Sequence, residues 1–228
     1  STWMGWERKR GKLMELNWLL RGAKDTSYST IVGRLPGPFR FVVTLDSDTI
    51  LPRGAAKRLV AKLAHPLNRA RFDPRTGRVA RGYSILQPRV TPSLPPQDDT
   101  SFFQTIYSTL QGLDPYAFTV SDVYQDLFGE GSFAGKGIYD IDALSLALGD
   151  RIPQNAVLSH DLLEGNYARA ALVTDVEVVE DHPTAYAAAA ARTHRWTRGD
   201  WQLLPWILAR HDGLSPLVLR SRTLPPTT

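Results

Sequence analysis

Two aspartates follow a run of apolar residues and are the first candidates for chemistry. Asp46 and Asp48 come directly after residues 39–45, which read FRFVVTL and are rich in β-branched side chains. Ligands of open α/β sheets bind at the carboxyl ends of the strands, and carboxylate oxygens suit Mg²⁺ or Mn²⁺. The spacing therefore predicts a site for a divalent cation that carries a diphosphate. The alternative is a polar turn after a strand, in which Asp and Ser are favoured.

A third acid stands in Ser159-His160-Asp161, with Glu164 three residues further on. The structural interpretation is a helix cap, because an acid followed by Glu at the third position matches the capping pattern. The functional interpretation is that Asp161 acts as a general base, provided that another residue such as Ser159 caps the helix. A hydrolase triad is disfavoured, since three adjacent residues rarely align as nucleophile, base and orienting acid.

Basic and aromatic residues gather in Arg192-Thr193-His194-Arg195-Trp196. If this segment is helical, Arg192, Arg195 and Trp196 lie on one face. Two guanidinium groups on a face can hold phosphate oxygens, and an indole ring offers a flat surface for a sugar or a base. The alternative is a solvated basic face with an aromatic side chain in the core.

Glycine is concentrated in residues 129–137, which read GEGSFAGKG. The segment is not a phosphate-binding P-loop, since Glu130 and Gly137 stand where that motif needs Gly and Ser or Thr. We expect a loop whose backbone can approach a ligand closely. The candidate contacts near this loop are Lys136, Asp126 and His160.

The elements that must position these residues alternate between strands and helices. The patterns predict strands over residues 39–45, 79–90 and 173–179, and a loop or hairpin over residues 66–78. They predict helices over residues 12–21, 55–64, 101–110, 122–128, 141–148, 162–171 and 184–210, the last with a kink at Pro205. This alternation indicates a layered α/β domain.

Composition excludes several classes of protein. The 228 residues are 43% hydrophobic, which is enough for a sizeable core of one large domain or two small ones. There is no cysteine, which excludes disulfide frameworks, zinc ribbons, iron–sulfur clusters and cysteine nucleophiles. The net charge of +4 is too small to indicate nucleic-acid binding by itself. No run approaches the roughly 20 apolar residues of a transmembrane helix.

Taken in order, these segments resemble the glycosyltransferase domain of bacterial cyclic β-1,2-glucan synthases, within the inverting GT-A class that includes cellulose and chitin synthases. The class pattern is an aspartate pair at a strand end, a later aspartate that opens a helix, and a Q/R-x-x-R-W motif. The runs that resemble the family itself are GWERKRGKLMELN (5–17), HPLNRARFDPRTGRV (65–79), ILQPRVTPSLP (85–95), DPYAFTVSDVYQDLFGEGSFAGKGIYDIDA (114–143), LSHDLLEG (158–165) and HRWTRGDWQLLPW (194–206). The resemblance covers nearly the whole chain except the last dozen or so residues.

This resemblance implies a GT-A-like, Rossmann-like mixed sheet flanked by helices. It also implies inverting transfer of glucose from UDP-glucose to a growing cyclic β-1,2-glucan. The site residues that it implies are Asp46 and Asp48 for Mg²⁺ or Mn²⁺, Asp161 as general base, Arg192 and Arg195 for the donor diphosphate, and Trp196 for the acceptor. His160 stands where cellulose synthases usually have Glu, and its role is left open.

The resemblance further implies an N-terminally incomplete catalytic domain over residues 1–228, of which about 211–228 form a poorly determined tail. Two strands that hold the uridine would precede it, so we expect the isolated chain to bind UDP-glucose poorly. Membrane helices would follow it, which places the parent protein at the cytoplasmic face of the bacterial inner membrane. The alternatives are another processive β-glycan synthase, a basic nucleic-acid-binding module, and a remnant that folds without catalysing a reaction. The resemblance itself implies no nucleic-acid partner.

Overall fold

The structure is a computed structural model and describes residues 6–35, 37–93, 101–107, 123–149, 151–157, 160–181 and 183–208. Its centre is a five-stranded sheet in the order β1-β6-β5-β7-β2, with a separate two-stranded hairpin of β3 and β4. In chain order the described elements are α1 (Arg8–Leu20), β1 (Phe41–Thr44), β2 (Thr49–Ile50), α2 (Ala55–Ala64), the 3₁₀ helix η1 (Pro66–Asn68), β3 (Arg71–Asp73), β4 (Arg78–Arg81), β5 (Ile85–Pro92), α3 (Phe102–Tyr107), α5 (Val123–Phe128), β6 (Gly137–Asp140), α6 (Ile141–Leu148), α7 (Asp161–Ala168), β7 (Ala170–Glu180), α8 (Tyr186–Trp201) and α9 (Leu204–Ile207).

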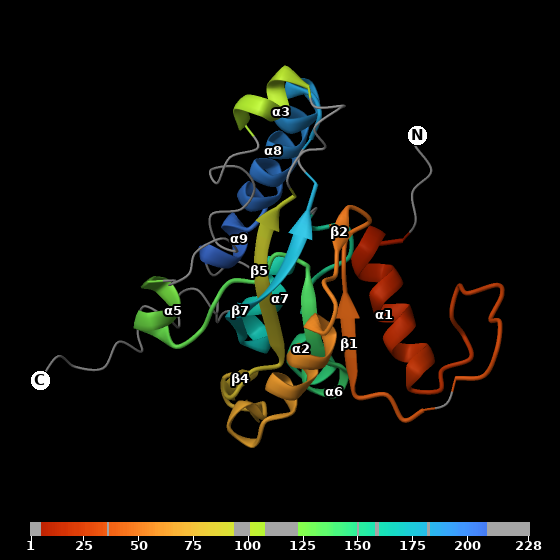
Figure 1. Ribbon diagram of the computed structural model, residues 1–228. Helices are drawn as coiled ribbons and strands as arrows, with labels where there is room; N and C mark the ends of the chain where they lie inside the picture. The colour runs from red at the N-terminus through yellow and green to blue at the C-terminus, as the bar shows by residue number, and fades with distance from the viewer. Residues whose placement is uncertain are drawn as a thin grey trace, which may run out of the picture.

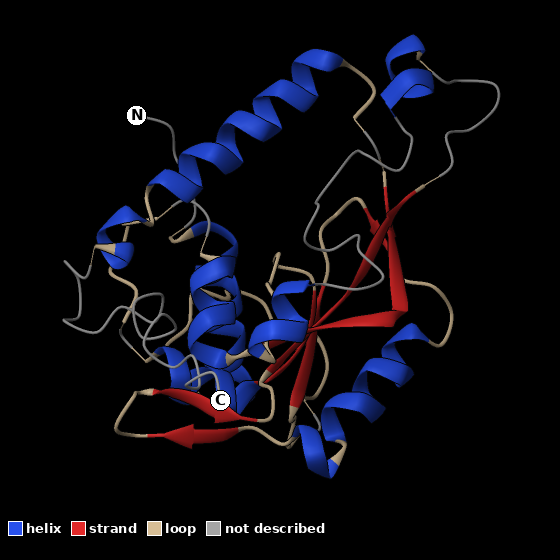
Figure 2. Cartoon of the chain, turned by 90° about the vertical axis from the view of Figure 1, so that its left-hand side faces the viewer, coloured by secondary structure: helices blue, strands red, loops and turns tan. Residues whose placement is uncertain are grey.

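Helices cover both faces of the sheet, with α2 in front and α6 and α7 behind in the view of Figure 1. The view turned by 90° in Figure 2 also shows helices on either side of the strands. Ala55, Leu59 and Leu63 repeat every four residues and therefore line one side of α2. They pack against Ile138 of β6 and Val176 of β7. This arrangement confirms the expected mixed sheet flanked by helices.

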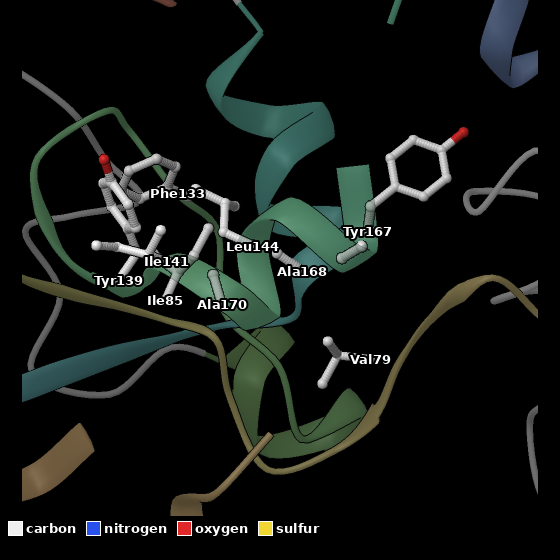
Figure 3. Close-up of a cluster of buried hydrophobic side chains, with 10 residues drawn as sticks. Val79, Ile85, Phe133, Tyr139, Ile141, Leu144, Tyr167, Ala168 and Ala170 are labelled. Carbon is white, nitrogen blue, oxygen red and sulfur yellow. The ribbon is translucent and has the colours of Figure 1, made fainter. Parts of the chain in front are cut away.

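The core behind the sheet joins β6, α6 and α7 to the glycine-rich loop. Figure 3 shows Phe133, Tyr139 and Leu144 beside one another within this cluster. Ile85 and Ile141 are fully buried in the same cluster. Because Phe133 belongs to the loop between α5 and β6, this packing fixes the loop against the helices.

The strand directions bring several distant segments to one edge of the sheet. β1 and β5 each pair antiparallel with β6, and β5 pairs parallel with β7, so β1, β5 and β7 run the same way (Figure 1). Their carboxyl ends therefore share an edge with the start of the oppositely directed β6, and we call it the carboxyl edge. Residues 45–48 join β1 and β2, which lie at opposite sides of the sheet, and so they cross this edge.

Two expectations about strands are corrected, and one strand of the central sheet was not predicted. The run at residues 39–45 was expected to be buried on both faces, but β1 is an edge strand in which only Thr44 is buried. The expected strand over residues 79–90 is two strands, because the chain turns at Gly82, where φ is 65°. β6 was not predicted, since its four residues are too few to show a period.

The long helix expected over residues 184–210 is also corrected. α8 ends at Trp201, and α9 begins at Leu204 after a two-residue turn. Pro205 lies in the first turn of α9, where its missing N–H group is tolerated, rather than at a kink. The expected tail at about 211–228 lies outside the described residues. No helix in the described part of the chain has the length and apolar composition that a bilayer crossing requires.

Candidate functional site

Three carboxylates meet at the carboxyl edge of the sheet. Asp46 and Asp48 lie in the segment that crosses this edge, and Glu180 is the last residue of β7. One oxygen from each of the three lies within 4.8 Å of the others. Glu180 is buried, whereas the two aspartates are half-buried. We call these three residues the acid cluster.

Two lysines pair with carboxylates of the acid cluster. Lys136 immediately precedes β6, so it stands at the same edge, and its Nζ lies 2.8 Å from Glu180 Oε1 and 3.5 Å from Asp46 Oδ2. Lys9 reaches the cluster from α1, and its Nζ lies 2.5 Å from Asp46 Oδ1. Lys136 is buried, and a buried charge is stable only when it is paired. The lysines therefore permit the carboxylates to lie so close together.

The helix α8 contributes an arginine on the other side of the cluster. The Nη1 atom of Arg192 lies 3.8 Å from Asp48 Oδ2 and 4.0 Å from Glu180 Oε1. Its guanidinium carbon lies 5.1 Å from the ring centre of Trp196, one helical turn later. Arg195 is exposed. The structure thus joins Arg192 and Trp196 to the acid cluster and leaves Arg195 in solvent.

Asp161 is the first residue of α7, and the capping interpretation is wrong. The N-cap is His160, and it makes no hydrogen bond from its side chain to the helix. Ser159, the other candidate cap, lies outside the described residues. The Asp161 carboxylate is therefore not committed to a cap, and it contributes to the wall of a pocket between α1, α6 and α7.

Gly135 connects Asp161 to the acid cluster. Its φ is +80°, and a Cβ at this position would lie 2.8 Å from Asp161 Oδ2. Its carbonyl oxygen accepts a 2.8 Å hydrogen bond from Lys9, the same lysine that pairs with Asp46. The neighbouring Ala134 N–H donates to the buried side chain of Gln87, which holds the loop to β5. Only glycine fits here, because a side chain would displace the Asp161 carboxylate.

Burial shifts the pKa values of three groups on α7 and at its start. It raises the pKa of Asp161 to about 6, with Lys9 opposing the shift and Asp46 adding to it. It raises the pKa of Glu164 to about 8, and the neighbouring charge of Asp161 adds to that rise. Burial, together with Arg10 and Lys9, lowers the pKa of His160 to about 4. At pH 7 Asp161 is therefore mostly ionised, whereas Glu164 is protonated and His160 is neutral.

The acid cluster has the donor set of a Mg²⁺ or Mn²⁺ site. Its ligands would be three carboxylate oxygens, the type that these hard cations prefer. Oxygens around one octahedral ion lie roughly 3–4 Å apart, so the observed separation of up to 4.8 Å needs only small side-chain rotations. The ammonium groups of Lys136 and Lys9 already contact these oxygens, and a cation would have to share or displace them.

Sequence reasoning placed some residues in the site and missed others. Asp126 lies on exposed α5, and it belongs neither to the acid cluster nor to the pocket wall. Glu180 was missed, although it ends a predicted strand in the same way that the aspartate pair follows one. Lys9 lies within the run GWERKRGKLMELN, and nothing in that run indicates which of its charges reaches the site.

A mixed α/β sheet with clustered carboxylates at its carboxyl edge places the chain in the Rossmann-like class of ligand-binding folds. Over 217 residues, or 95% of its length, the chain is 60% identical to cyclic β-(1,2)-glucan synthase NdvB of Rhizobium meliloti (strain 1021). The chain spans 8% of the length of that relative. The expected resemblance to cyclic β-1,2-glucan synthases is thus confirmed. No protein-family model matches the chain.

The raised pKa of the Glu164 carboxyl should make stability depend on pH. Its pKa is raised from 4.5 to about 8 by folding, so the native state binds a proton that the unfolded chain releases. The free energy of unfolding should therefore fall as pH rises, by about 1.5 kcal/mol between pH 6.5 and 8. The lowered pKa of His160 acts in the opposite direction, chiefly below pH 7, and offsets only a small part of this fall. Urea denaturation at a series of pH values measures this slope.

Glu164→Gln is the matched variant, because it keeps the shape of the side chain and removes its titration. Its free energy of unfolding should be nearly flat between pH 6.5 and 8. A wild-type slope that is zero, or that persists unchanged in Glu164→Gln, would contradict the assignment.

Proposed function

We propose that this chain forms part of an inverting glucosyltransferase that moves glucose from UDP-glucose to a growing cyclic β-1,2-glucan. The observation that carries the proposal is that three distant stretches of sequence meet at one edge of the sheet. They supply the acid cluster, the separate carboxylate of Asp161 and the guanidinium group of Arg192. The similarity to a glucan synthase supports the same reaction class. The proposal locates transfer at the cytoplasmic face of a bacterial inner membrane.

Asp161 is the proposed general base. A hydroxyl of the acceptor attacks the anomeric carbon of the donor while its proton passes to the Asp161 carboxylate. The new glycosidic bond forms as the bond to the diphosphate breaks, and UDP leaves with the electron pair. A pKa of about 6 suits this role, because the carboxylate is mostly ionised at pH 7 and still basic enough to accept a proton.

The remaining residues stabilise the leaving group and orient the sugars. Asp46, Asp48 and Glu180 are the proposed ligands of Mg²⁺ or Mn²⁺, which supplies positive charge for the diphosphate when it is bound. Arg192 lies beside this cluster and adds a second positive charge. Arg195 is proposed to reach the diphosphate from solvent, and the half-exposed ring of Trp196 to stack on the acceptor.

The role of Asp161 is tested by Asp161→Asn in the full-length synthase. Loss of the base should reduce glucan formation by at least about 10²-fold, since general bases contribute roughly 10²–10⁴. Binding of UDP-glucose should stay within a few-fold of wild type, because the base acts on the acceptor. Incorporation of radiolabelled glucose and equilibrium binding of the donor measure the two effects. The control is Asp126→Asn on exposed α5. Turnover near the wild-type rate in Asp161→Asn would show that the base is another group.

The proposed metal ligands are tested by titrating this chain with Mn²⁺ in a calorimeter. Replacing a ligand should lower the affinity for the ion by at least about tenfold, so Asp48→Asn is expected to bind Mn²⁺ much less tightly than wild type. Asp48 is suited to this test because it is half-buried and its loss leaves the buried Lys136–Glu180 pair intact. Asp126→Asn again serves as the control. Equal affinities for wild type and Asp48→Asn would exclude the acid cluster as the metal site.

A further inference from the structure

The proposed reaction assigns a role to Asp161 but no ligand to the pocket beside it. It has a volume of about 440 Å³ and lies between α1, α6 and α7. This volume falls within the roughly 300–1,000 Å³ that is usual for sites of small molecules. None of Asp46, Asp48, Arg192 and Trp196 lines it. We call it the α1–α7 pocket and define it by Trp6, Trp18, Tyr139, His160, Asp161 and Glu164.

One side of the α1–α7 pocket is aromatic. The rings of Trp6 and Trp18 stack with their centres 6.1 Å apart, and both are partly exposed. Trp6 folds back over α1 at Gly11, where a Cβ would lie 2.1 Å from the Trp6 carbonyl oxygen. Phe133 and Tyr139, seen in Figure 3, extend the apolar wall from the core. Flat aromatic faces pack well against the C–H face of a sugar ring while its hydroxyls point elsewhere.

The other side of the pocket has polar groups that need partners. His160 is 8% exposed and Arg10 is 5% exposed, and both line the pocket. His160 Nδ1 and Arg10 Nε are buried and make no hydrogen bond within the described residues. Buried polar atoms normally have a partner, so each of these indicates a missing group that can donate or accept. Asp161 and Glu164 add two carboxyl groups to the same wall.

The chemistry of this wall favours an uncharged ligand with several hydroxyls. The protonated carboxyl of Glu164 can donate, the neutral imidazole of His160 can accept, and the ionised Asp161 accepts. A hydroxyl satisfies either kind of group. Lys9 and Arg10 also line the pocket, but each is already paired with a carboxylate, Lys9 with Asp46 and Arg10 with Glu7, so another buried charge would be costly. The combination of an aromatic side and a hydrogen-bonding side is typical of a site for a neutral sugar.

We propose that the α1–α7 pocket binds a glucosyl residue of a neutral glucan, with one face on the tryptophan pair and its hydroxyls on the α7 wall. A residue bound there presents a hydroxyl to Asp161, so the pocket acts as an acceptor subsite distinct from Trp196. That the sugar is glucose and an acceptor rests on the proposed function. That the ligand is a neutral sugar rests on the pocket alone.

Titration of this chain with sophorose, the β-1,2-linked disaccharide of glucose, tests the proposal by NMR shifts and tryptophan fluorescence. Sophorose should bind, and Trp18→Ala should weaken it at least about tenfold by removing the aromatic face. Glu164→Leu is a second variant that leaves the tryptophans intact and removes the carboxyl donor, so it should also weaken binding. The control is Trp201→Ala, because Trp201 is 67% exposed on α8 and does not line the pocket. Its affinity for sophorose should equal that of wild type.

The outcomes separate this inference from the proposed function. No binding of sophorose up to high millimolar concentration would overturn the inference, as would equal losses in Trp18→Ala and Trp201→Ala. Neither result affects the Asp161→Asn experiment, which tests transfer in the full-length synthase. Binding of sophorose that depends on Trp18, together with normal transfer by Asp161→Asn, would keep the sugar site and remove the proposed base.

Discussion

Electrostatic repulsion between carboxylates at one edge of the sheet is the constraint on which the rest of the site depends. Two unit charges about 4.8 Å apart repel by about 3–4 kcal/mol at an effective dielectric constant near 20. Three such groups within 4.8 Å of one another therefore need positive charge nearby to offset their repulsion. Lys9, Lys136 and Arg192 supply that charge from α1, from the start of β6 and from α8. Neutralising the acid cluster therefore ties three distant segments to the same edge.

This coupling also connects the two halves of the site. Lys9 pairs with Asp46 and donates to the carbonyl oxygen of Gly135, whose missing side chain leaves room for the Asp161 carboxylate. Lys9 and Gly135 also line the α1–α7 pocket, so this connection joins the acid cluster to the pocket. A donor at the cluster and an acceptor in the pocket would then meet at Asp161, which fits the role of a base between two substrates.

Local sequence patterns indicated Asp46, Asp48 and Asp161 as candidate site residues. They did not indicate the residues that only the three-dimensional fold places beside them. Asp46 and Asp48 were found because a buried strand followed by acids is a local signal, and Asp161 because it opens a helix. The capping interpretation of Asp161 was wrong, since His160 takes the N-cap and the carboxylate faces the pocket. Glu180 was missed although it follows a predicted strand as the aspartate pair does. Lys9 was missed because no local pattern indicates that α1 lies beside the carboxyl edge. The order β1-β6-β5-β7-β2 is not encoded in any local pattern, and β6 is too short to reveal itself.

The most direct test of this account is a double-mutant cycle on Lys136 and Glu180, measured by urea denaturation at pH 7. Lys136→Met leaves the buried Glu180 carboxylate without its nearest cation and should destabilise the chain by about 3–5 kcal/mol. Glu180→Gln should cost less, because Lys136 keeps Asp46 as a partner and repulsion within the acid cluster falls. The double variant removes both charges, so its loss should be smaller than the sum by more than about 1 kcal/mol. Losses that add to within about 0.5 kcal/mol would show that the two charges are not coupled, and would contradict the account.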